Sequence, residues 1–208
     1  MTAIPDRYAL RKQPTQPRAQ ATVTAIVDAA AQLVVSTGYA KTNTNLIAEL
    51  AGVSVGSLYE YFPGKEAVFA ELRRRFSLHH YQLLTGHPRP ETPRTMLRHL
   101  VTTHVGFVRE HLSLYVALTT EVPRFAIADV EAYVLGDFIP QSEQFLSLHR
   151  QHLKPSADVQ FVTEFLIRVL SSTVNDLALR SPDRLLGDEI TQALYDMLDS
   201  YLLQPGAP

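Results

Sequence analysis

One stretch near the N-terminus constrains this chain more than any other. Residues 42–65 read TNTNLIAELAGVSVGSLYEYFPGK, in which two short apolar-periodic segments flank the sequence Ala51-Gly52-Val53. The pair Pro63-Gly64 ends the second segment. Two helices joined by a tight turn of about 3–4 residues, often with a glycine, form a helix-turn-helix. The second helix of such a unit is the one that enters the major groove of DNA.

The segments around this stretch complete a three-helix unit. The run from Arg18 to Thr37 has apolar residues at helical spacing, and Gly38 follows where a helix ends in a left-handed residue. Asn43 is expected to cap the next helix and Ser54 the one after it, because their side-chain oxygens accept from unpaired N–H groups. Helical spacing predicts that these residues face inward: Leu46, Ile47, Leu50, Val55, Leu58 and Phe62.

The rest of the chain also has helical periodicity and no convincing strand pattern, so the predicted fold class is all-α. Further helices are expected at about 65–84, 93–111, 113–121, 126–152, 156–180 and 182–203. A kink or break is expected at Pro140, because proline cannot donate the helical hydrogen bond.

Charge is distributed unevenly along the chain. The net charge is −2, but residues 1–75 carry nine Lys and Arg against six acidic residues, and the remainder carries ten against fifteen. This asymmetry favours an anionic partner for the N-terminal part, although chance variation in solvated faces is an alternative. Residues 1–18, with three prolines and four basic residues, are expected to be a mobile arm that follows DNA or is a frayed tail.

Composition narrows the other possibilities. The absence of cysteine excludes disulfides, thiol catalysis and cysteine zinc sites. We find no run of about 18 apolar residues and no apolar centre of a signal peptide, so we expect a soluble, cytoplasmic protein with no membrane partner.

The stretch from Gly38 to Leu72 resembles the N-terminal domain of TetR-family transcriptional regulators. The matching features are the Gly-aromatic pair after the first helix, Ala-Gly-Val-Ser at the turn, Gly-x-x-Tyr-x-Tyr-Phe in the third helix and Lys-Glu at the start of the fourth. The resemblance covers roughly residues 19–75. It implies a homodimer that binds a palindromic double-stranded operator, usually as a repressor, and that responds to a small-molecule effector. It implies no enzyme activity and no cofactor.

The same resemblance implies a set of DNA contacts, some to phosphates and some to bases. Those expected are Thr42, Thr44, Asn45, Ser54, Val55, Gly56, Ser57, Tyr59, Tyr61 and Lys65. Glu60 departs from the basic or neutral residue that an anionic backbone favours. Because the start of the third helix has small neutral side chains, we expect part of the specificity to come from DNA shape and from Asn45 or the arm.

We divide the chain into an arm at 1–18, a helix-turn-helix domain at 19–65 and a helical effector-binding and dimerisation domain at 66–208. Apolar and amphipathic residues predicted to bind a mostly apolar effector are Phe76, His80, Leu83, His104, Phe107, Tyr115, Phe125, Tyr133 and Phe138. Wide apolar arcs on the last two helices indicate a second chain or a central place in the core. The residues predicted at a dimer interface are Phe161, Phe165, Val169, Leu194, Met197, Leu198 and Tyr201.

Three alternatives compete with this interpretation. The run Gly52 to Gly56 matches G-x-S-x-G, but a nucleophile elbow needs a preceding strand, and Ser54 is better placed as a helix cap. The histidine pairs at 149 and 152, 104 and 111, and 79 and 80 lack an acidic cluster or H-E-x-x-H spacing, so we expect no metal site. A helical interaction module without DNA binding is the third alternative.

Overall fold

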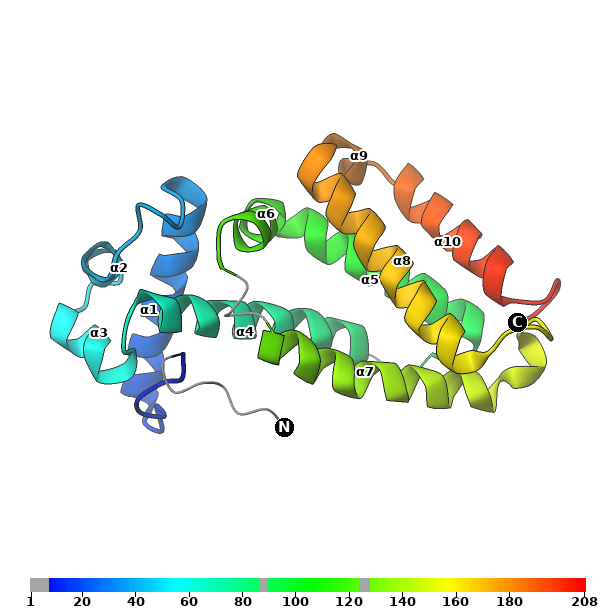
Figure 1. Cartoon of the computed structure of the whole chain (residues 1–208), viewed down its shortest axis with the longest axis horizontal. Coiled ribbons are helices and arrows are strands. Elements are labelled where there is room, and N and C mark those ends of the chain that lie inside the picture. Colours follow the sequence, from blue (N-terminus) through cyan, green and yellow to red (C-terminus); the bar gives the residue numbers. More distant parts are fainter. Residues whose placement is uncertain (1–7, 87–89, 124–127) are drawn as a thin grey trace. The chain divides into compact units, whose positions relative to one another are not determined.

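The computed structural model describes residues 8–86, 90–123 and 128–208, without the side chains of 128–135 and 137. Within these ranges the chain is helical and has no strand beyond an isolated bridge between Leu153 and Leu203, which confirms the all-α class (Figure 1). The elements are α1 (Pro17–Ser36), α2 (Thr44–Leu50), α3 (Val55–Tyr61), α4 (Lys65–Thr85), α5 (Pro93–Glu110), α6 (Leu112–Thr120), α7 (Ala128–Leu148), the short 3-10 helix η2 (Arg150–His152), α8 (Val159–Arg180), α9 (Asp183–Leu186) and α10 (Glu189–Leu202).

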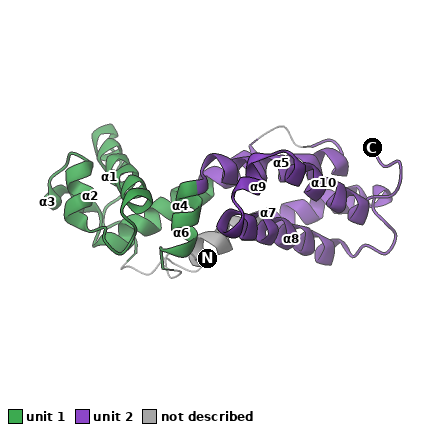
Figure 2. Cartoon of the chain, turned by 90° about the horizontal axis from the view of Figure 1, so that it is seen from above, with its two compact units in different colours: residues 1–78, 113–133 green, residues 79–112, 134–208 purple. Residues whose placement is uncertain are grey.

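The helices gather into two compact units, coloured separately in Figure 2. Unit 1 comprises residues 1–78 and 113–133, and unit 2 comprises residues 79–112 and 134–208. The units group the chain differently from the domains expected from sequence, because α6 and the first part of α4 fall in unit 1.

Unit 1 is built around α1, which packs against α2 and α3. Its inward stripe includes Val23, Ile26 and Ala30, all fully buried. Gly38 follows the helix with φ +85°, the left-handed conformation expected for it. By length and composition α1 could cross a membrane, but its apolar stripe lies in the core of unit 1.

The caps of the two short helices are confirmed, whereas part of their predicted inner face is not. The Asn43 side chain accepts from two backbone N–H groups at 3.0 Å each, and Ser54 Oγ accepts from the Ser57 N–H at 3.0 Å. The core residues of α2 and α3 are Ile47, Ala48, Leu58 and Tyr61, together with Phe62, which follows α3. Leu46, Leu50 and Val55 are exposed, so their predicted burial was wrong. A seven-residue helix packed on one side buries a narrower stripe than the sequence pattern indicated.

The expected mobile arm is only partly outside the fold. Residues 1–7 lie outside the described residues, but Tyr8 is buried in the core of unit 1. The Arg11 N–H donates to the Tyr61 carbonyl at 2.8 Å, and its guanidinium donates to the Tyr59 carbonyl at 3.3 Å. The arm is therefore bound to the C-terminal end of α3 from residue 8, which corrects the expectation for residues 8–11.

In unit 2, α5 contacts α8, α9 and α10. Two arginines of α5 contact α10. Arg94 forms an ion pair with Asp199 at 2.9 Å, and the Arg98 guanidinium lies 4.0 Å from the centre of the Tyr195 ring. α7 remains helical through Pro140, so no break occurs there. A proline removes its own N–H bond and crowds the carbonyl four residues before it, but the turns on both sides of Pro140 continue the helix. α7 ends at Leu148, before the separate turn η2, instead of running on to residue 152.

Candidate functional site

The outer face of α2 and α3 carries most of the predicted DNA contacts. Ser54, Val55, Gly56 and Tyr59 are exposed on α3 or at its start, and Asn45 is exposed at the start of α2. Thr44 and Ser57 are half-buried on the same two elements. This face is polar or small, so it lets backbone and base edges approach closely.

A hydroxyl pair links the two helices of the motif. Thr44 Oγ1 lies 3.1 Å from the Tyr59 hydroxyl, which joins the first turn of α2 to the middle of α3. Hydroxyls of this kind contact phosphate oxygens in protein–DNA complexes and set the register without reading sequence. The structure therefore brings together two residues that the sequence predicted separately.

Two predicted contacts are turned inward. Thr42 is 2% exposed, and its hydroxyl donates to the Gly38 carbonyl at 2.8 Å, which ties the loop after α1 to itself. Tyr61 is 8% exposed and belongs to the core of unit 1. Because both side chains serve the interior, their prediction as DNA contacts is corrected.

Lys65 has intramolecular partners that the sequence did not indicate. Its Nζ donates to the Tyr39 carbonyl at 3.0 Å and lies 4.0 Å from the centre of the Tyr39 ring, a cation–π geometry. The Tyr39 N–H donates to Glu121 Oε2 at 2.8 Å, and the ring packs edge-on against Phe69. Burial, followed by the nearby charge of Glu66, raises the pKa of the Tyr39 phenol.

Lys65 and Glu121 both bind the backbone of Tyr39, in the loop that leads into the helix-turn-helix. Lys65 is the first residue of α4, and Glu121 directly follows α6. Tyr39 and Glu121 are 82 residues apart, so no local pattern could have paired them. Only the Gly-aromatic pair after α1 marked Tyr39 as unusual.

The basic run at residues 73–75 contributes to the positive charge of the N-terminal part but is used within unit 1. Arg74 and Arg75 both donate to the buried Glu71 carboxylate, at 2.7 and 2.8 Å. Burial alone would raise the pKa of Glu71, but the hydrogen bonds from these two arginines outweigh it and lower the pKa. Arg75 also donates to Thr24, and Arg73 donates to the Leu118 carbonyl. These charges hold helices together and are not arranged as a DNA-binding patch.

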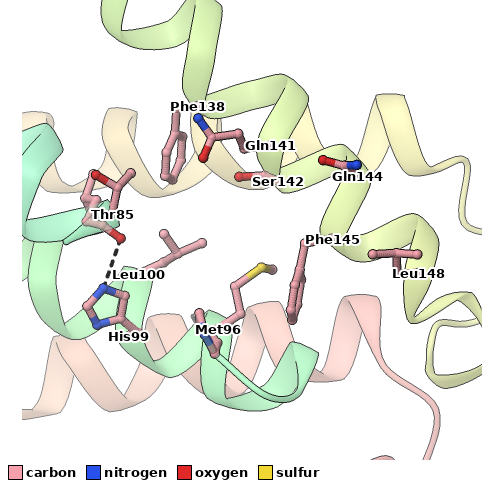
Figure 3. Close-up of a pocket in the computed structure, with 12 residues that line it drawn as sticks. Thr85, Met96, His99, Leu100, Phe138, Gln141, Ser142, Gln144, Phe145 and Leu148 are labelled. Carbon is pink, nitrogen blue, oxygen red and sulfur yellow. Dashed lines mark hydrogen bonds between the residues drawn. The ribbon is translucent and has the colours of Figure 1, made fainter. Parts of the chain in front are cut away.

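Unit 2 contains a pocket of about 160 Å3 (Figure 3). Its walls come from the end of α4, the first half of α5 and the second half of α7. The lining residues are Leu84, Thr85, Pro90, Met96, His99, Leu100, Phe138, Gln141, Ser142, Gln144, Phe145 and Leu148.

Of the nine predicted effector residues, only Phe138 lines this pocket. Phe76 and Tyr115 belong to unit 1, while Leu83 is half-buried on the last turns of α4. Phe125 lies outside the described residues, and the side chain of Tyr133 is not described. The pocket begins nearer the C-terminal end of α4 than the sequence reasoning placed it.

The other three predicted residues form a buried cluster. His80 stacks on Phe107 with 4.4 Å between ring centres, and its Nε2 lies 3.2 Å from His104 Nδ1. Burial, then the charges of His104 and His79, lowers the pKa of His80 to about 3, and burial lowers the pKa of His104 to about 4. Both rings are therefore neutral at pH 7, and His104 Nε2 is buried without a hydrogen bond.

An apolar face covers parts of α8 and α10. Phe161 and Phe165 stack with 5.7 Å between ring centres, and Phe165 lies 5.2 Å from Tyr201. Phe161 is 60% exposed and Met197 47% exposed, with Val169 half-buried on the same helix as Phe161. We call Phe161, Phe165, Met197 and Tyr201 the aromatic face.

Two residues predicted at the dimer interface do not belong to this face. Leu194 and Leu198 are buried inside unit 2, so they cannot lie at an interface without repacking. They occupy the inner side of α10, which packs on α5.

The rival chemistries find no matching geometry in the described part of the chain. Ser54 lies between two helices and caps the second, whereas a nucleophile elbow follows a strand. Among the described residues no group of three or more His, Asp or Glu is placed to hold a metal ion.

Residues 26–72 match the family model described as bacterial regulatory proteins, tetR family. The match spans α2 and α3, together with parts of α1 and α4. No curated protein sequence matches the chain.

Solved structures of regulators have a similar fold over nearly the whole chain. The fatty acid degradation regulator FadR from Bacillus halodurans is 19% identical, with a TM-score of 0.70 over 89% of this chain and 96% of that one. SmeT in its triclosan complex is 20% identical, with a TM-score of 0.71 over 90% and 94%. NalD of Pseudomonas aeruginosa, the secondary repressor of the MexAB-OprM multidrug efflux pump, is 22% identical, with a TM-score of 0.69 over 90% and 98%. Residues 26–72 therefore resemble the bacterial regulatory proteins of the tetR family, and the chain has a fold similar to that of solved regulator structures.

Proposed function

We propose that this protein is a transcriptional repressor that binds a palindromic operator as a homodimer and leaves it when a small, mostly apolar effector binds. The observation that carries the proposal is the exposed outer face of α2 and α3, whose inner sides are buried in the core of unit 1. NalD, which has a similar fold, is itself a repressor.

The base-reading surface is the start of α3. A Cβ atom added at Gly56 would have Ser54 Oγ, at 3.7 Å, as its nearest neighbour. The backbone of α3 is therefore accessible at this position. Ser54, Val55 and Ser57 surround it, and the Thr44–Tyr59 hydroxyl pair lies at its edge. Such a surface favours close van der Waals approach and hydroxyl contacts, with the rest of the specificity supplied by DNA shape and Asn45.

Lys65 contributes in two ways. Its ammonium group has three donors, of which the Tyr39 carbonyl takes one, so it can fix the motif and still contact a phosphate. The partial burial of Lys65 restricts its motion, which makes a phosphate contact from it better defined.

The aromatic face of unit 2 is the proposed dimer interface. Four large apolar side chains on two neighbouring helices are exposed together, which is the composition of an interface core. A dimer is needed because two recognition helices must meet successive major grooves about 34–36 Å apart.

Effector control requires that the ligand bind one of two arrangements more tightly than the other. The boundary between the units falls between Leu78 and His79, within the continuous helix α4. Lys65 begins this helix beside the motif, and Leu84 and Thr85 near its end line the pocket. We propose that the ligand favours one of two arrangements by binding at the end of the helix that begins with Lys65.

The proposal is tested by selecting an operator from a random duplex library and measuring its affinity by fluorescence anisotropy. Gly56→Val should weaken binding at least about a hundredfold, because a β-branched side chain blocks close approach to the groove. The control is Gly106→Val on α5, where a Cβ meets open space. Affinity should also fall steeply with salt, as phosphate contacts require.

Two results would contradict the proposal. One is that no duplex is enriched by the selection, which would leave a helical module without DNA binding. The other is that Gly56→Val binds the selected operator as tightly as the Gly106→Val control.

A further inference from the structure

The part of the pocket lining that the structure describes contains no carboxylate, ammonium or guanidinium group. Its described lining residues supply seven apolar side chains together with hydroxyl, amide and imidazole groups, and none is Asp, Glu, Lys or Arg. A buried ionised group needs an opposite charge or several hydrogen bonds to offset the loss of water. A charged ligand would therefore be poorly held by these walls.

The one titratable side chain among the described lining residues has its ring nitrogens occupied. His99 Nε2 lies 3.1 Å from the Leu84 carbonyl, which only an N–H can satisfy, so this nitrogen is the donor. His99 Nδ1 then accepts from Thr103 Oγ1 at 3.3 Å. The ring is fixed between α4 and α5 by these two contacts.

Three of the five described polar lining side chains lie on α7; the other two are Thr85 on α4 and His99 on α5. Gln141, Ser142 and Gln144 follow one another along α7, whereas α5 contributes Met96 and Leu100 opposite them. In Figure 3 the rings of Phe138 and Phe145 project from α7, with Gln141 and Ser142 between them and Gln144 beyond Phe145. A ligand in this space meets apolar side chains around its body and amide or hydroxyl groups at one edge.

The size of the pocket limits the ligand further. Its volume of about 160 Å3 is close to that of an engineered apolar cavity of ~150 Å3 that binds benzene. Pockets for drug-sized ligands occupy roughly 300–1,000 Å3. The space between these side chains therefore suits a single six-membered ring better than a multi-ring compound.

We propose that this pocket binds a neutral, single-ring compound with one hydrogen-bonding group, its ring against Met96, Leu100 and Phe145 and its polar group towards Gln141 and Ser142. The inference rests on the proposed effector function and names the chemical class of the effector. Simple phenols and aryl alcohols have this chemistry.

The test uses the full chain and isothermal titration calorimetry with four probes: 4-methylphenol, toluene, 4-methylbenzoate and palmitate. 4-Methylphenol should bind with one site per chain, and 4-methylbenzoate should bind at least about tenfold more weakly because its charge has no partner. Palmitate should not bind in this pocket. Tighter binding of 4-methylbenzoate or palmitate than of 4-methylphenol would overturn the assignment.

Two variants locate the binding site. Leu100→Trp should fill the pocket and abolish binding of 4-methylphenol, whereas Leu179→Trp, at an exposed apolar position on α8, should bind it normally. Ser142→Ala, which leaves the packing intact, should reduce the preference for 4-methylphenol over toluene by about three- to tenfold. Unchanged binding in Leu100→Trp, or an unchanged preference in Ser142→Ala, would show that the compound binds elsewhere.

Operator affinity measured on the same samples separates this inference from the proposed function. Operator binding that stays tight while no probe binds would overturn the ligand class and leave the DNA-binding function standing. Binding of 4-methylphenol at this site without a change in operator affinity would confirm the ligand class and contradict the effector role.

Discussion

Around the helix-turn-helix of unit 1, polar side chains are occupied with backbone groups, whereas in unit 2 aromatic side chains are exposed and a buried imidazole nitrogen has no partner. Asn43 and Ser54 cap helices, and Glu121 binds the Tyr39 N–H. In contrast, Phe161 is 60% exposed, and His104 Nε2 is buried without a hydrogen bond. The exposed aromatic side chains fit the proposed contact of unit 2 with a second chain.

The largest expected effect tests the aromatic face. Phe165→Glu places a charge between Phe161 and Tyr201, where a second chain would bury it. The dimer dissociation constant should rise at least about a hundredfold, or ~3 kcal/mol. Sedimentation equilibrium measures it, with Leu186→Glu as the matched control because Leu186 is 61% exposed on α9, outside this face. Equal effects of the two variants would show that the aromatic face is not the interface.

A second prediction concerns the buried histidines of unit 2. Because the folded-state pKa values of His80 and His104 lie near 3 and 4, below the ordinary 6.5, the unfolded chain takes up protons first as the pH falls. Their contribution to stability is present above about pH 6.5 and is lost as the pH falls towards 4. The free energy of unfolding should drop by roughly 2 kcal/mol per histidine between pH 7 and pH 5.

Urea unfolding at several pH values checks this expectation. His104→Leu removes one titrating ring and the unpaired Nε2 without a large change in volume, so it should remove about half of the pH dependence. His152→Gln, in the turn η2, is the control and should leave the dependence as it was. If His104→Leu has the same pH dependence as the original protein, the buried pair is not its source.

The third prediction concerns the cap of α2 in the helix-turn-helix. Asn43→Ala leaves the N–H groups of Asn45 and Leu46 without their acceptor, which should cost ~1 kcal/mol of the free energy of unfolding. Operator affinity should fall as well, since Asn45 lies in the first turn of α2. Asn43→Ser, which restores a capping oxygen, should recover most of the stability. A variant as stable as the original protein would show that water replaces the cap.

These comparisons also show what the sequence could predict. Signals within a few residues of each other were confirmed: the caps at Asn43 and Ser54 and the left-handed Gly38. Features that depend on distant residues were missed, such as the contact of Tyr39 with Glu121. Sequence periodicity cannot predict such a contact, because the contact depends on the packing of helices that are far apart in the chain.

The same distinction explains the errors in the predicted site. The motif identified the helices that form the outer face, but Thr42 and Tyr61 turned out to be buried. Tyr61 lies in a seven-residue helix, which is too short for its pattern to show which side is covered, and Thr42 lies in the loop before α2, where no periodicity applies. The pocket was misplaced for a related reason: an apolar residue on a helix, such as Phe107, fits a core as well as a cavity, and here it packs on His80.

The smallest expected effect concerns the residues before α1, where the sequence predicted motion and the structure shows attachment. Arg11→Ala removes the guanidinium bond to the Tyr59 carbonyl but not the backbone bond to Tyr61, and Tyr8 stays in the core. Because the lost bond is exposed, the free energy of unfolding should fall by only about 0.5 kcal/mol. Lys12→Ala removes a neighbouring exposed charge and should leave stability unchanged.

If Arg11 also lies against a phosphate, its loss should reduce the slope of log affinity against log salt by about one. An unchanged slope with reduced stability would mean that Arg11 positions α3 without touching DNA, and equal stability losses in the two variants would mean that the bond to Tyr59 contributes nothing.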